Sequence, residues 1–283
     1  AAYLQEEDAR RANRYHTSRH AKALPLFTRA DVHRVLARFR TLSPGREAAL
    51  GSLRLRFTPV GHLLGAAAVT LIDGKHALCF SGDVGRRHDL LMPPPEPLQQ
   101  ADTLIVESTY GNRRHPVEDP APLLGEIVRE TVRRGGSVLM PAFAVGRAQA
   151  LLLLLQRLKA DGQIPQKLPI FLDSPMAIEA TALYRQFRRL LRPPAAEIER
   201  LTDGVTLVTT GAQSMRLSRS RYPSAIISAS GMATGGRVLH HLKAMAPQPR
   251  NHIVFPGFQV GGTRGAKLVE GAREIKIFGE YVA

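Results

Sequence analysis

The most constraining feature of this sequence is the succession of an apolar run, a loop of small residues and a helix at residues 225–245. Residues 225–229 read as a strand, residues 230–236 contain three glycines, and residues 238–245 read as a helix. A helix start exposes unpaired backbone N–H groups and favours negative charge, and glycines let an anion approach closely. The segment therefore predicts an anion site where the strand ends.

The same order recurs elsewhere in the chain. Residues 137–141 lead through a loop into a leucine-rich helix at 148–158, and residues 252–256 lead through a glycine-containing loop into a helix at 266–270. A fourth strand, at 103–107, ends in carboxylate and hydroxyl groups. Ligands of open parallel α/β sheets bind beyond the carboxyl ends of the strands. We therefore expect one sheet edge, suited to a phosphate-rich ligand, to gather Glu107, Ser108, Arg147, Ser230 and Arg264.

The charge of the chain also favours an anionic partner. It carries 39 Lys plus Arg against 24 Asp plus Glu, a formal net charge of +15. Arginine suits bidentate phosphate contact, and a large surplus favours polyanion binding through counterion release. An ordinary basic protein would show the same surplus, because net charge governs association and not fold.

Other aspects of the composition exclude several classes of protein. With 44% hydrophobic residues the chain is globular, and no apolar stretch approaches the ~20 residues of a membrane span. Residues 1–8 are polar and do not resemble a secretory leader. The single cysteine, Cys79, lies in an apolar run, which excludes a disulfide framework and suits a reducing compartment. We expect a cytoplasmic protein without a membrane partner.

The pattern of elements changes along the chain. Residues 1–40 read as loop plus a helix at 29–40, and residues 52–111 as successive strands separated by Gly and Pro turns. From about residue 112 strands alternate with helices, which predicts a parallel sheet with covered faces. The expected strands are 53–60, 67–72, 76–81, 103–107, 137–141, 169–172, 206–209, 225–229 and 252–256, and the later helices are 123–134, 148–158, 178–191, 238–245 and 266–270. We place a domain boundary near residues 111–122.

Two short motifs suggest metal chemistry. His62 follows a strand beside Gly61, and Asp83 ends another strand after Ser81-Gly82. A histidine and an aspartate at neighbouring strand ends could offer zinc an imidazole nitrogen and a bridging carboxylate. Each motif taken alone also fits an ordinary turn.

Read together, the motifs resemble those of one family. In chain order they are Gly61-His62, Ser81-Gly82-Asp83, Glu107-Ser108-Thr109-Tyr110-Gly111, Pro141-Ala142-Phe143-Ala144-Val145-Gly146-Arg147, Asp173-Ser174-Pro175-Met176-Ala177, Ser230-Gly231-Met232 and Gly262-Thr263-Arg264-Gly265. This set resembles the β-CASP branch of the metallo-β-lactamase superfamily over nearly all of residues 52–283. The resemblance implies an α/β fold: an incomplete metallo-β-lactamase αββα sandwich at 1–111, and a nearly complete β-CASP domain, a parallel sheet flanked by helices, at 112–283.

The resemblance also implies an activity. Such proteins hold two zinc ions and hydrolyse RNA phosphodiester bonds as endonucleases, 5′-exonucleases or both, so RNA is the expected partner. His62 is implied as a metal ligand, Asp83 as the catalytic carboxylate that bridges the metals, and Glu107 as the acidic residue that orients a catalytic histidine. The residues implied to hold the substrate are Ser108, Tyr110, Arg147, Ser230, Gly231, Met232, Thr263 and Arg264. The sequence leaves a homodimer open.

The chain also departs from the family pattern. The signature His-x-His-x-Asp-His does not occur in it, and it ends before the family's later histidine motifs. We expect an internal section of a nuclease that is metal-poor and inactive alone, because catalytic zinc sites take three protein ligands. A non-catalytic RNA-binding scaffold and a DNA-processing nuclease are the alternatives within the superfamily. Hydrolysis of small thioesters or lactones fits less well, because the β-CASP-like part is long and the chain is basic.

A phosphate-binding motor is a further alternative. Gly231 and Gly236 have the Walker A separation, but Arg237 and Val238 stand where lysine and a serine or threonine are needed.

Three further features also have a purely structural interpretation. Asp173 either is structural or organises the turn after it, and of the pair at 240–241 we expect one ring to pack and the other to meet solvent. The basic run 216–221 is either a solvated face or an RNA contact.

Overall fold

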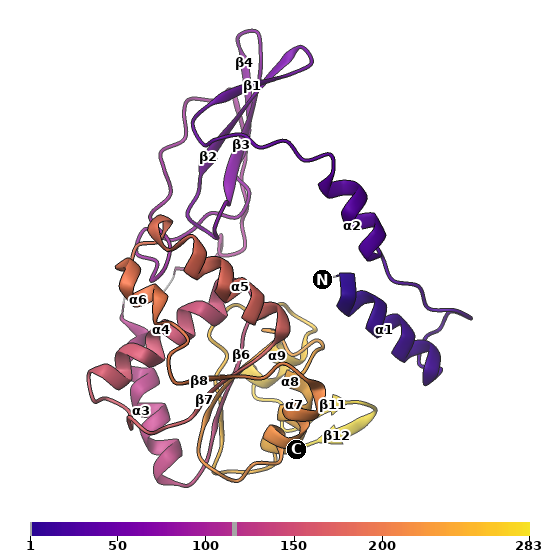
Figure 1. The fold of residues 1–283 in the computed structure, drawn as a ribbon, viewed down its shortest axis with the longest axis vertical. Helices are drawn as coiled ribbons and strands as arrows, with labels where there is room; N and C mark the ends of the chain where they lie inside the picture. The colour runs from indigo at the N-terminus through magenta and orange to yellow at the C-terminus, as the bar shows by residue number, and fades with distance from the viewer. Residues whose placement is uncertain (1, 115–117) are drawn as a thin grey trace.

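The computed structural model describes residues 2–114 and 118–283, which form two sheets with different surroundings. Figure 1 shows an upper part built around strands β1–β4 and a lower part in which helices surround strands β6–β8. Helices α1 (Ala2–Arg14) and α2 (Arg29–Leu36) precede the first sheet and lie to one side in that view. The α/β fold class is confirmed. His115 and Pro116, within the predicted boundary segment 111–122, lie outside the described residues.

The first sheet is mainly a meander. Its strands are β1 (Glu47–Leu50), β2 (Leu53–Pro59), β3 (Ala67–Asp73), β4 (His76–Phe80) and β5 (Thr103–Ile105), adjacent in that order. The first four pair antiparallel, and β5 pairs parallel to β4. The sheet has a thin core, because the buried cluster in it consists of Val60, Ala68 and Cys79.

The second sheet is wholly parallel. Its strands lie in the order β10-β6-β9-β7-β8. They are β6 (Val138–Pro141), β7 (Ile170–Asp173), β8 (Val205–Leu207), β9 (Ala225–Ser228) and β10 (His252–Ile253). The connecting elements are α3 (Pro120–Arg133), α4 (Arg147–Ala160), α5 (Pro175–Gln186), the 3-10 turn at Arg188–Leu190, α6 (Ala195–Glu199), α7 (Gly211–Ser218), α8 (Val238–Met245) and α9 (Arg264–Val269), followed by the hairpin β11 (Ile275–Ile277) and β12 (Glu280–Val282).

The two faces of the parallel sheet belong to different cores. Ala225 and Ile227 of β9 pack in a cluster with residues of α3, α4, α5 and α6, whereas Ile226 packs with α8 and the β11–β12 hairpin. Successive side chains of a strand point to opposite faces, so a continuous apolar run buried on both sides is expected here. The result is a helix–sheet–helix sandwich, with α3–α6 and α7–α9 on opposite sides in Figure 1.

Several expected elements differ in extent for local reasons. The helix expected at 29–40 ends at Leu36, because the N–H groups of Arg38 and Phe39 bond three residues back and close the chain into a turn. The helix expected at 178–191 runs from Pro175 to Gln186, since the Ser174 hydroxyl caps its start. Helices α1, α6 and α7 and strands β1, β11 and β12 were not expected.

One expectation about the sheet is wrong. We expected the strand at 103–107 to end at the same edge of one parallel sheet as the strands preceding Arg147, Ser230 and Arg264. The structure instead pairs β5 with β4 in the first sheet. Three residues of parallel pairing were enough to place it there, and neither periodicity nor length distinguishes the two sheets in the sequence.

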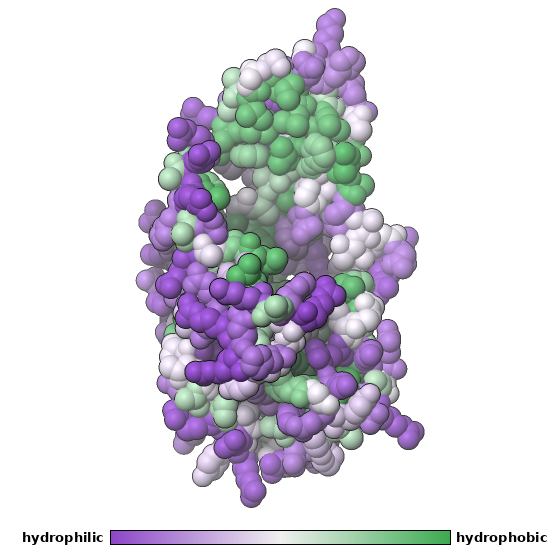
Figure 2. Space-filling view, turned by 90° about the vertical axis from the view of Figure 1, so that its right-hand side faces the viewer, coloured by the Kyte–Doolittle hydropathy of each residue, from purple (hydrophilic) through white to green (hydrophobic). Residues whose placement is uncertain are grey.

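The first sheet leaves apolar surface open. Leu104, Ile105 and Val106 are 50%, 50% and 61% exposed. Figure 2 shows a broad hydrophobic area on the upper part of the molecule, where this sheet lies, whereas the lower part is mostly hydrophilic. No helix among the described residues is long and apolar enough to cross a membrane.

Candidate functional site

His62 and Asp83 follow strands β2 and β4, which flank β3 in the first sheet and are not neighbours as we expected. The Gly85 N–H donates to the Val60 carbonyl at 2.7 Å. A Cβ on Gly85 would come 2.0 Å from the Gly61 carbonyl oxygen, so the two turns approach more closely than any other residue would permit. The His62 Nε2 lies 3.8 Å from the Asp83 Oδ2. Both side chains are open to solvent.

Glu107 lies beside this pair. Its carboxylate accepts from the Thr109 N–H at 2.8 Å and from the Val84 N–H at 3.5 Å. The bond from Thr109 is the main reason that the pKa of Glu107 lies below its ordinary value, although partial burial opposes it. Glu107 is therefore held ionised. Ser108 and Tyr110 follow it in a turn closed by the Gly111 N–H on the Ser108 carbonyl at 3.0 Å.

These residues do not form a metal site by themselves. His62 and Asp83 supply one nitrogen and one carboxylate, and no group of three or more potential metal ligands occurs within residues 2–114 and 118–283. A catalytic zinc ion takes three protein ligands. The described donor set therefore does not fit a catalytic zinc ion without further ligands.

The side-chain amide of one buried residue, Gln149, fixes the loop between β6 and α4. Gln149 is fully buried; its Oε1 accepts from the Gly146 N–H at 2.7 Å and its Nε2 donates to the Ala144 carbonyl at 3.1 Å and to the Thr181 hydroxyl at 2.9 Å. These bonds hold the loop and the first turn of α4 in one position. Arg147, the first residue of α4, is thereby presented at the carboxyl edge of the sheet.

Arg147 lies within electrostatic range of a second arginine. Burial is the main reason that the pKa of Arg147 lies below its ordinary value, and the charge of Arg86 acts in the same direction, whereas the charge of Asp89 opposes it. Arginine stays protonated in spite of this shift. In the described part of the chain neither guanidinium donates a hydrogen bond or forms an ion pair. Two arginines without a direct carboxylate partner favour a bound anion, and Arg86 is a site residue that the sequence reasoning missed.

The Ser230 loop forms a compact turn between β9 and α8. The Ser230 hydroxyl accepts from the Thr234 N–H at 3.1 Å and the Gly235 N–H at 3.3 Å. A Cβ on Gly231 would come 2.8 Å from the Phe143 nitrogen, so this loop packs directly against the loop after β6. Among the hydrogen bonds of the described residues, the N–H groups of Gly231 and Met232 have no protein acceptor. At the start of α8 itself, however, the N–H groups of Val238, Leu239 and His240 donate to the Ala229, Gly236 and Arg237 carbonyls, so the expected anion site at that helix start is wrong, and Gly231 and Met232 are the donors left in the loop.

Thr263 and Arg264 are bonded within the protein. The Thr263 hydroxyl donates to the Val260 carbonyl at 2.7 Å and accepts from the Ala266 N–H at 3.1 Å, as a helix cap does. The Arg264 Nε donates to the Lys276 carbonyl at 2.6 Å, and its Nη1 lies 3.3 Å from the Ala233 carbonyl. Arg264 thus ties the Ser230 loop to the β11–β12 hairpin, which leaves it less of its guanidinium for a ligand.

Packing contacts join the residues of the two sheets. A Cβ on Gly146 would come 2.5 Å from the Leu63 side chain, which places the loop after β6 against the residue following His62. The Tyr110 and Phe258 rings meet edge to face with centroids 5.4 Å apart. The Gln259 Nε2 donates to the Gly231 carbonyl at 3.1 Å, so the segment carrying Phe258 also contacts the Ser230 loop. The predicted residues therefore form two groups joined by these contacts.

A buried ionic cluster of Asp173, Arg237 and His241 lies at the start of α8, where the Ser230 loop ends. Asp173, which ends β7, is 0% exposed; it accepts from the Arg237 Nη1 at 2.8 Å and from the Ser214 hydroxyl, and the His241 Nε2 lies at 2.7 Å. Arg237 also donates to the Val208 and Thr209 carbonyls, each at 2.8 Å. His241 is fully buried and His240 only partly, as expected for this pair. Of the two readings of Asp173, the structure shows the structural one.

The comparisons with known proteins agree on one family. The profile of the Beta-Casp domain matches residues 148–268. Ribonuclease TTHA0252 of Thermus thermophilus is 37% identical over 268 residues, which cover 91% of this chain and 61% of that protein. Transcription termination factor FttA of Pyrococcus abyssi is 35% identical over 272 residues, 90% of this chain and 41% of that protein. An RNase J-like protein of Methanocaldococcus jannaschii is 34% identical over 236 residues, 80% of this chain and 54% of that protein. The chain thus spans between 41% and 61% of these relatives' lengths.

Proposed function

This chain belongs to the β-CASP branch of the metallo-β-lactamase superfamily, and on that premise we propose that it is the RNA-holding section of a ribonuclease. The proposed activity is hydrolysis of RNA phosphodiester bonds, internally or from the 5′ end. RNA is favoured over DNA because two of the relatives are named as ribonucleases.

The observation that carries this proposal is the pair formed by Arg86 and Arg147. The charge of Arg86 acts on Arg147, and the Arg147 Nε would lie 3.8 Å from a Cβ on Gly257, in the segment whose Gln259 contacts the Ser230 loop. Charge-assisted contacts to phosphate are the strongest hydrogen bonds available to a protein surface, and arginine makes them in pairs. We propose that Arg147, Gly231 and Met232 bind the phosphates on both sides of the scissile bond.

Each remaining residue of the first group has a proposed task. The ionised Glu107 orients a neighbouring catalytic group, and the Tyr110 and Phe258 rings, with the Arg113 guanidinium 5.3 Å from the centre of the Phe258 ring, form an aromatic and cationic surface for a base. The side chains of Ser230, Thr263 and Arg264 are bonded within the protein. We propose that these residues hold the Ser230 loop and the start of α9 in position and do not contact RNA through their side chains. His62 and Asp83 would contribute to a metal centre whose other ligands come from outside the described residues. On its own, this chain should bind RNA without cutting it.

Binding and cleavage test the proposal separately. The 283-residue chain should bind 5′-labelled RNA, and the Arg147→Ala variant should bind at least about tenfold more weakly, because the phosphate no longer has its charge-assisted hydrogen bonds from this guanidinium. An Arg189→Ala variant, which removes one exposed positive charge from the 3-10 turn, is the control for charge. A longer chain that carries this sequence together with the family's other metal motifs should cut RNA, and its Asp83→Ala variant should not. If the longer chain cut DNA and not RNA, the proposed RNA substrate would be wrong. If it cut neither, the proposed nuclease activity would be wrong.

One observation favours a second candidate. Because the donor set at His62 and Asp83 does not fit a catalytic zinc ion by itself, a non-catalytic RNA-binding scaffold would show the same described geometry. The two functions differ in the longer chain: the scaffold binds RNA there and leaves it intact, whereas the ribonuclease shortens it.

A further inference from the structure

A second basic recess lies at the opposite edge of the parallel sheet. Ser137, Ser224 and Asn251 line it, and they immediately precede β6, β9 and β10. Strand β9 runs from this recess to the Ser230 loop, and its four residues span roughly 13 Å at about 3.3 Å per residue. The recess is therefore separate from the candidate site at the carboxyl ends of the strands.

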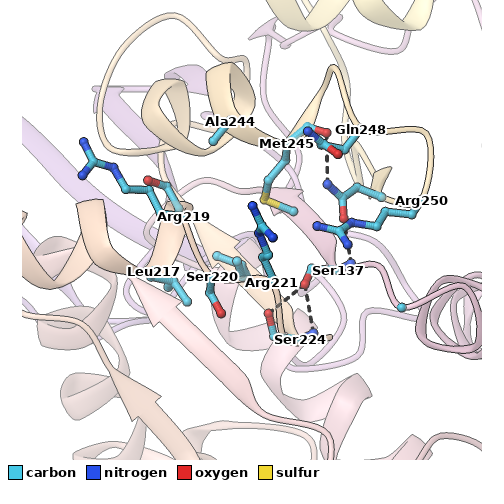
Figure 3. Close-up of a pocket in the computed structure, with 14 residues that line it drawn as sticks. Ser137, Leu217, Arg219, Ser220, Arg221, Ser224, Ala244, Met245, Gln248 and Arg250 are labelled. Carbon is cyan, nitrogen blue, oxygen red and sulfur yellow. Dashed lines mark hydrogen bonds between the residues drawn. The ribbon is translucent and has the colours of Figure 1, made fainter.

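The floor of the recess is held by hydrogen bonds. The Ser137 N–H donates to the Asn251 Oδ1 at 2.9 Å, and the Asn251 Nδ2 donates to the Met245 carbonyl at 3.1 Å. The Ser137 hydroxyl lies 3.1 Å from the Ser224 hydroxyl and accepts from the Ser224 N–H at 3.0 Å. Figure 3 shows these bonds as dashed lines, with those between Ser137 and Ser224 below the Arg221 and Arg250 side chains in that view. The frame is thus preformed, which lowers the entropic cost of binding a ligand there.

Its walls carry positive charge without a counterion. Arg219, Arg221 and Arg250 line the recess, and none of the described lining residues is acidic. Within the part of the chain that the structure describes, none of the three guanidinium groups donates a hydrogen bond or forms an ion pair. In Figure 3 the Arg221 and Arg250 side chains lie toward the middle of the group, whereas Arg219 extends to one side. Like charges held close together repel, and an anion between them relieves that repulsion.

The lining of the recess indicates the kind of anion. Its volume is about 240 Å³, and the more open recess beside it has a volume of about 390 Å³. No aromatic residue lines it, so it offers a base no stacking surface. A shallower recess adjoins it and shares Arg221, Gln248 and Arg250, so the basic surface continues along the molecule. These features suit a phosphate that is part of an extended strand.

We propose that Arg221 and Arg250 bind a backbone phosphate of the RNA strand at the amino edge of the parallel sheet, remote from the site of cleavage. This assignment rests on the proposed RNA substrate and extends the bound strand around the β-CASP domain. The basic run at 216–221, which had two readings in the sequence, thereby contributes to RNA binding through its last residue. A strand held at both edges binds more tightly when it is long enough to reach both.

The test is equilibrium binding by the 283-residue chain with EDTA present, using fluorescence anisotropy with a short and a long 5′-labelled RNA. The double variant Arg221→Ala/Arg250→Ala should bind the long RNA at least about tenfold more weakly. The plot of log affinity against log salt should also become shallower by about 0.7, the value for the one phosphate that the variant no longer neutralises. Binding of the short RNA should change much less. The control Arg38→Ala/Arg40→Ala removes the same charge from the exposed segment after α2 and should leave both affinities close to those of the unmodified chain.

Each other outcome overturns the proposal. Equal losses in both double variants would mean that net charge alone acts, and no loss, or no RNA binding by the chain at all, would mean that the recess does not hold the strand. Thermal stabilisation by inorganic phosphate that disappears in the double variant, without a change in RNA affinity, would assign the recess to a free anion. The measurement does not depend on cleavage, so a failure of the ribonuclease assignment in the longer chain remains distinguishable from a failure here.

Discussion

Replacing Arg237 by alanine tests the buried cluster behind the Ser230 loop. Asp173 is fully buried, and Arg237 supplies one of its hydrogen bonds and its formal counter-charge. The same guanidinium donates to the Val208 and Thr209 carbonyls. The Arg237→Ala variant therefore removes the ion-pair partner of Asp173. It also leaves the Val208 and Thr209 carbonyls, which follow β8, without this hydrogen-bond donor.

The expected cost follows from these contacts. Removing one partner of a buried ion pair costs about 3–5 kcal/mol, because the remaining charge stays buried without compensation. His241 and Ser214 still face Asp173 in the variant, so we expect a loss near the lower limit, about 3 kcal/mol. An Arg237→Lys variant keeps the charge without the planar fork and should lose less.

The assay is urea unfolding followed by far-ultraviolet circular dichroism, since the chain contains no tryptophan. The midpoint should fall at an unchanged slope. Arg189→Ala, on an exposed turn, should leave the midpoint where it is. A loss for Arg237→Ala below about 1 kcal/mol, the usual range for exposed charge pairs, would refute the reasoning.

The pH dependence gives the same cluster a second test. Burial raises the pKa of Asp173, but hydrogen bonds from His241, Ser214 and Arg237 outweigh burial and hold the pKa below its ordinary value. A carboxyl group with a depressed folded-state pKa stabilises the fold above its unfolded pKa, about 3.9, and loses that contribution as the pH falls through the folded value. The difference in unfolding free energy between the unmodified chain and the Arg237→Ala variant should therefore be largest at neutral pH and decrease below about pH 4.

Three further predictions concern single residues. Gly231→Ala should destabilise the protein by about 1–3 kcal/mol in urea unfolding, because its Cβ would come 2.8 Å from a backbone nitrogen of the neighbouring loop. Gly235→Ala, whose Cβ would meet nothing within 4 Å, is its matched control, and equal losses in the two variants would contradict the packing argument. The pKa of the Glu107 carboxyl, followed by NMR, should lie below its ordinary value, since the Thr109 and Val84 N–H groups hold its ionised form, and a normal or raised pKa would disprove that role. Cys79 is 1% exposed, so a thiol reagent should label it only as the first sheet opens, and labelling at the rate of a free thiol would show that the sheet does not protect it.

The sequence predicted the parallel sheet well, because its strands are apolar on both faces. Residues 225–228 are buried throughout, and glycine-rich loops mark the points where such strands end. The resemblance to a known family, supported by the comparisons, located the loops that carry Arg147 and Ser230. Their closeness in space follows from parallel pairing alone.

Other features depend on tertiary contacts that no local pattern reveals. Strand β5 reads like any short apolar strand, and its pairing with β4 decides its sheet. Arg86 became a candidate site residue only because the fold brings its charge within range of Arg147, which the sequence does not reveal. In the sequence, Arg237 stands where a Walker A motif would need lysine. In the structure it forms an ion pair with the buried carboxylate of Asp173.

The open edge of the first sheet has a consequence for how the protein behaves in concentrated solution. Strand β5 lies at one end of the strand order, so its outer backbone edge offers pairing to a second copy, which would also cover the exposed Leu104 and Ile105 side chains. The formal net charge of +15 keeps copies apart at low ionic strength, and added salt screens that repulsion. Salt should therefore promote self-association of this chain, and light scattering that rises with ionic strength would report the bare strand edge directly.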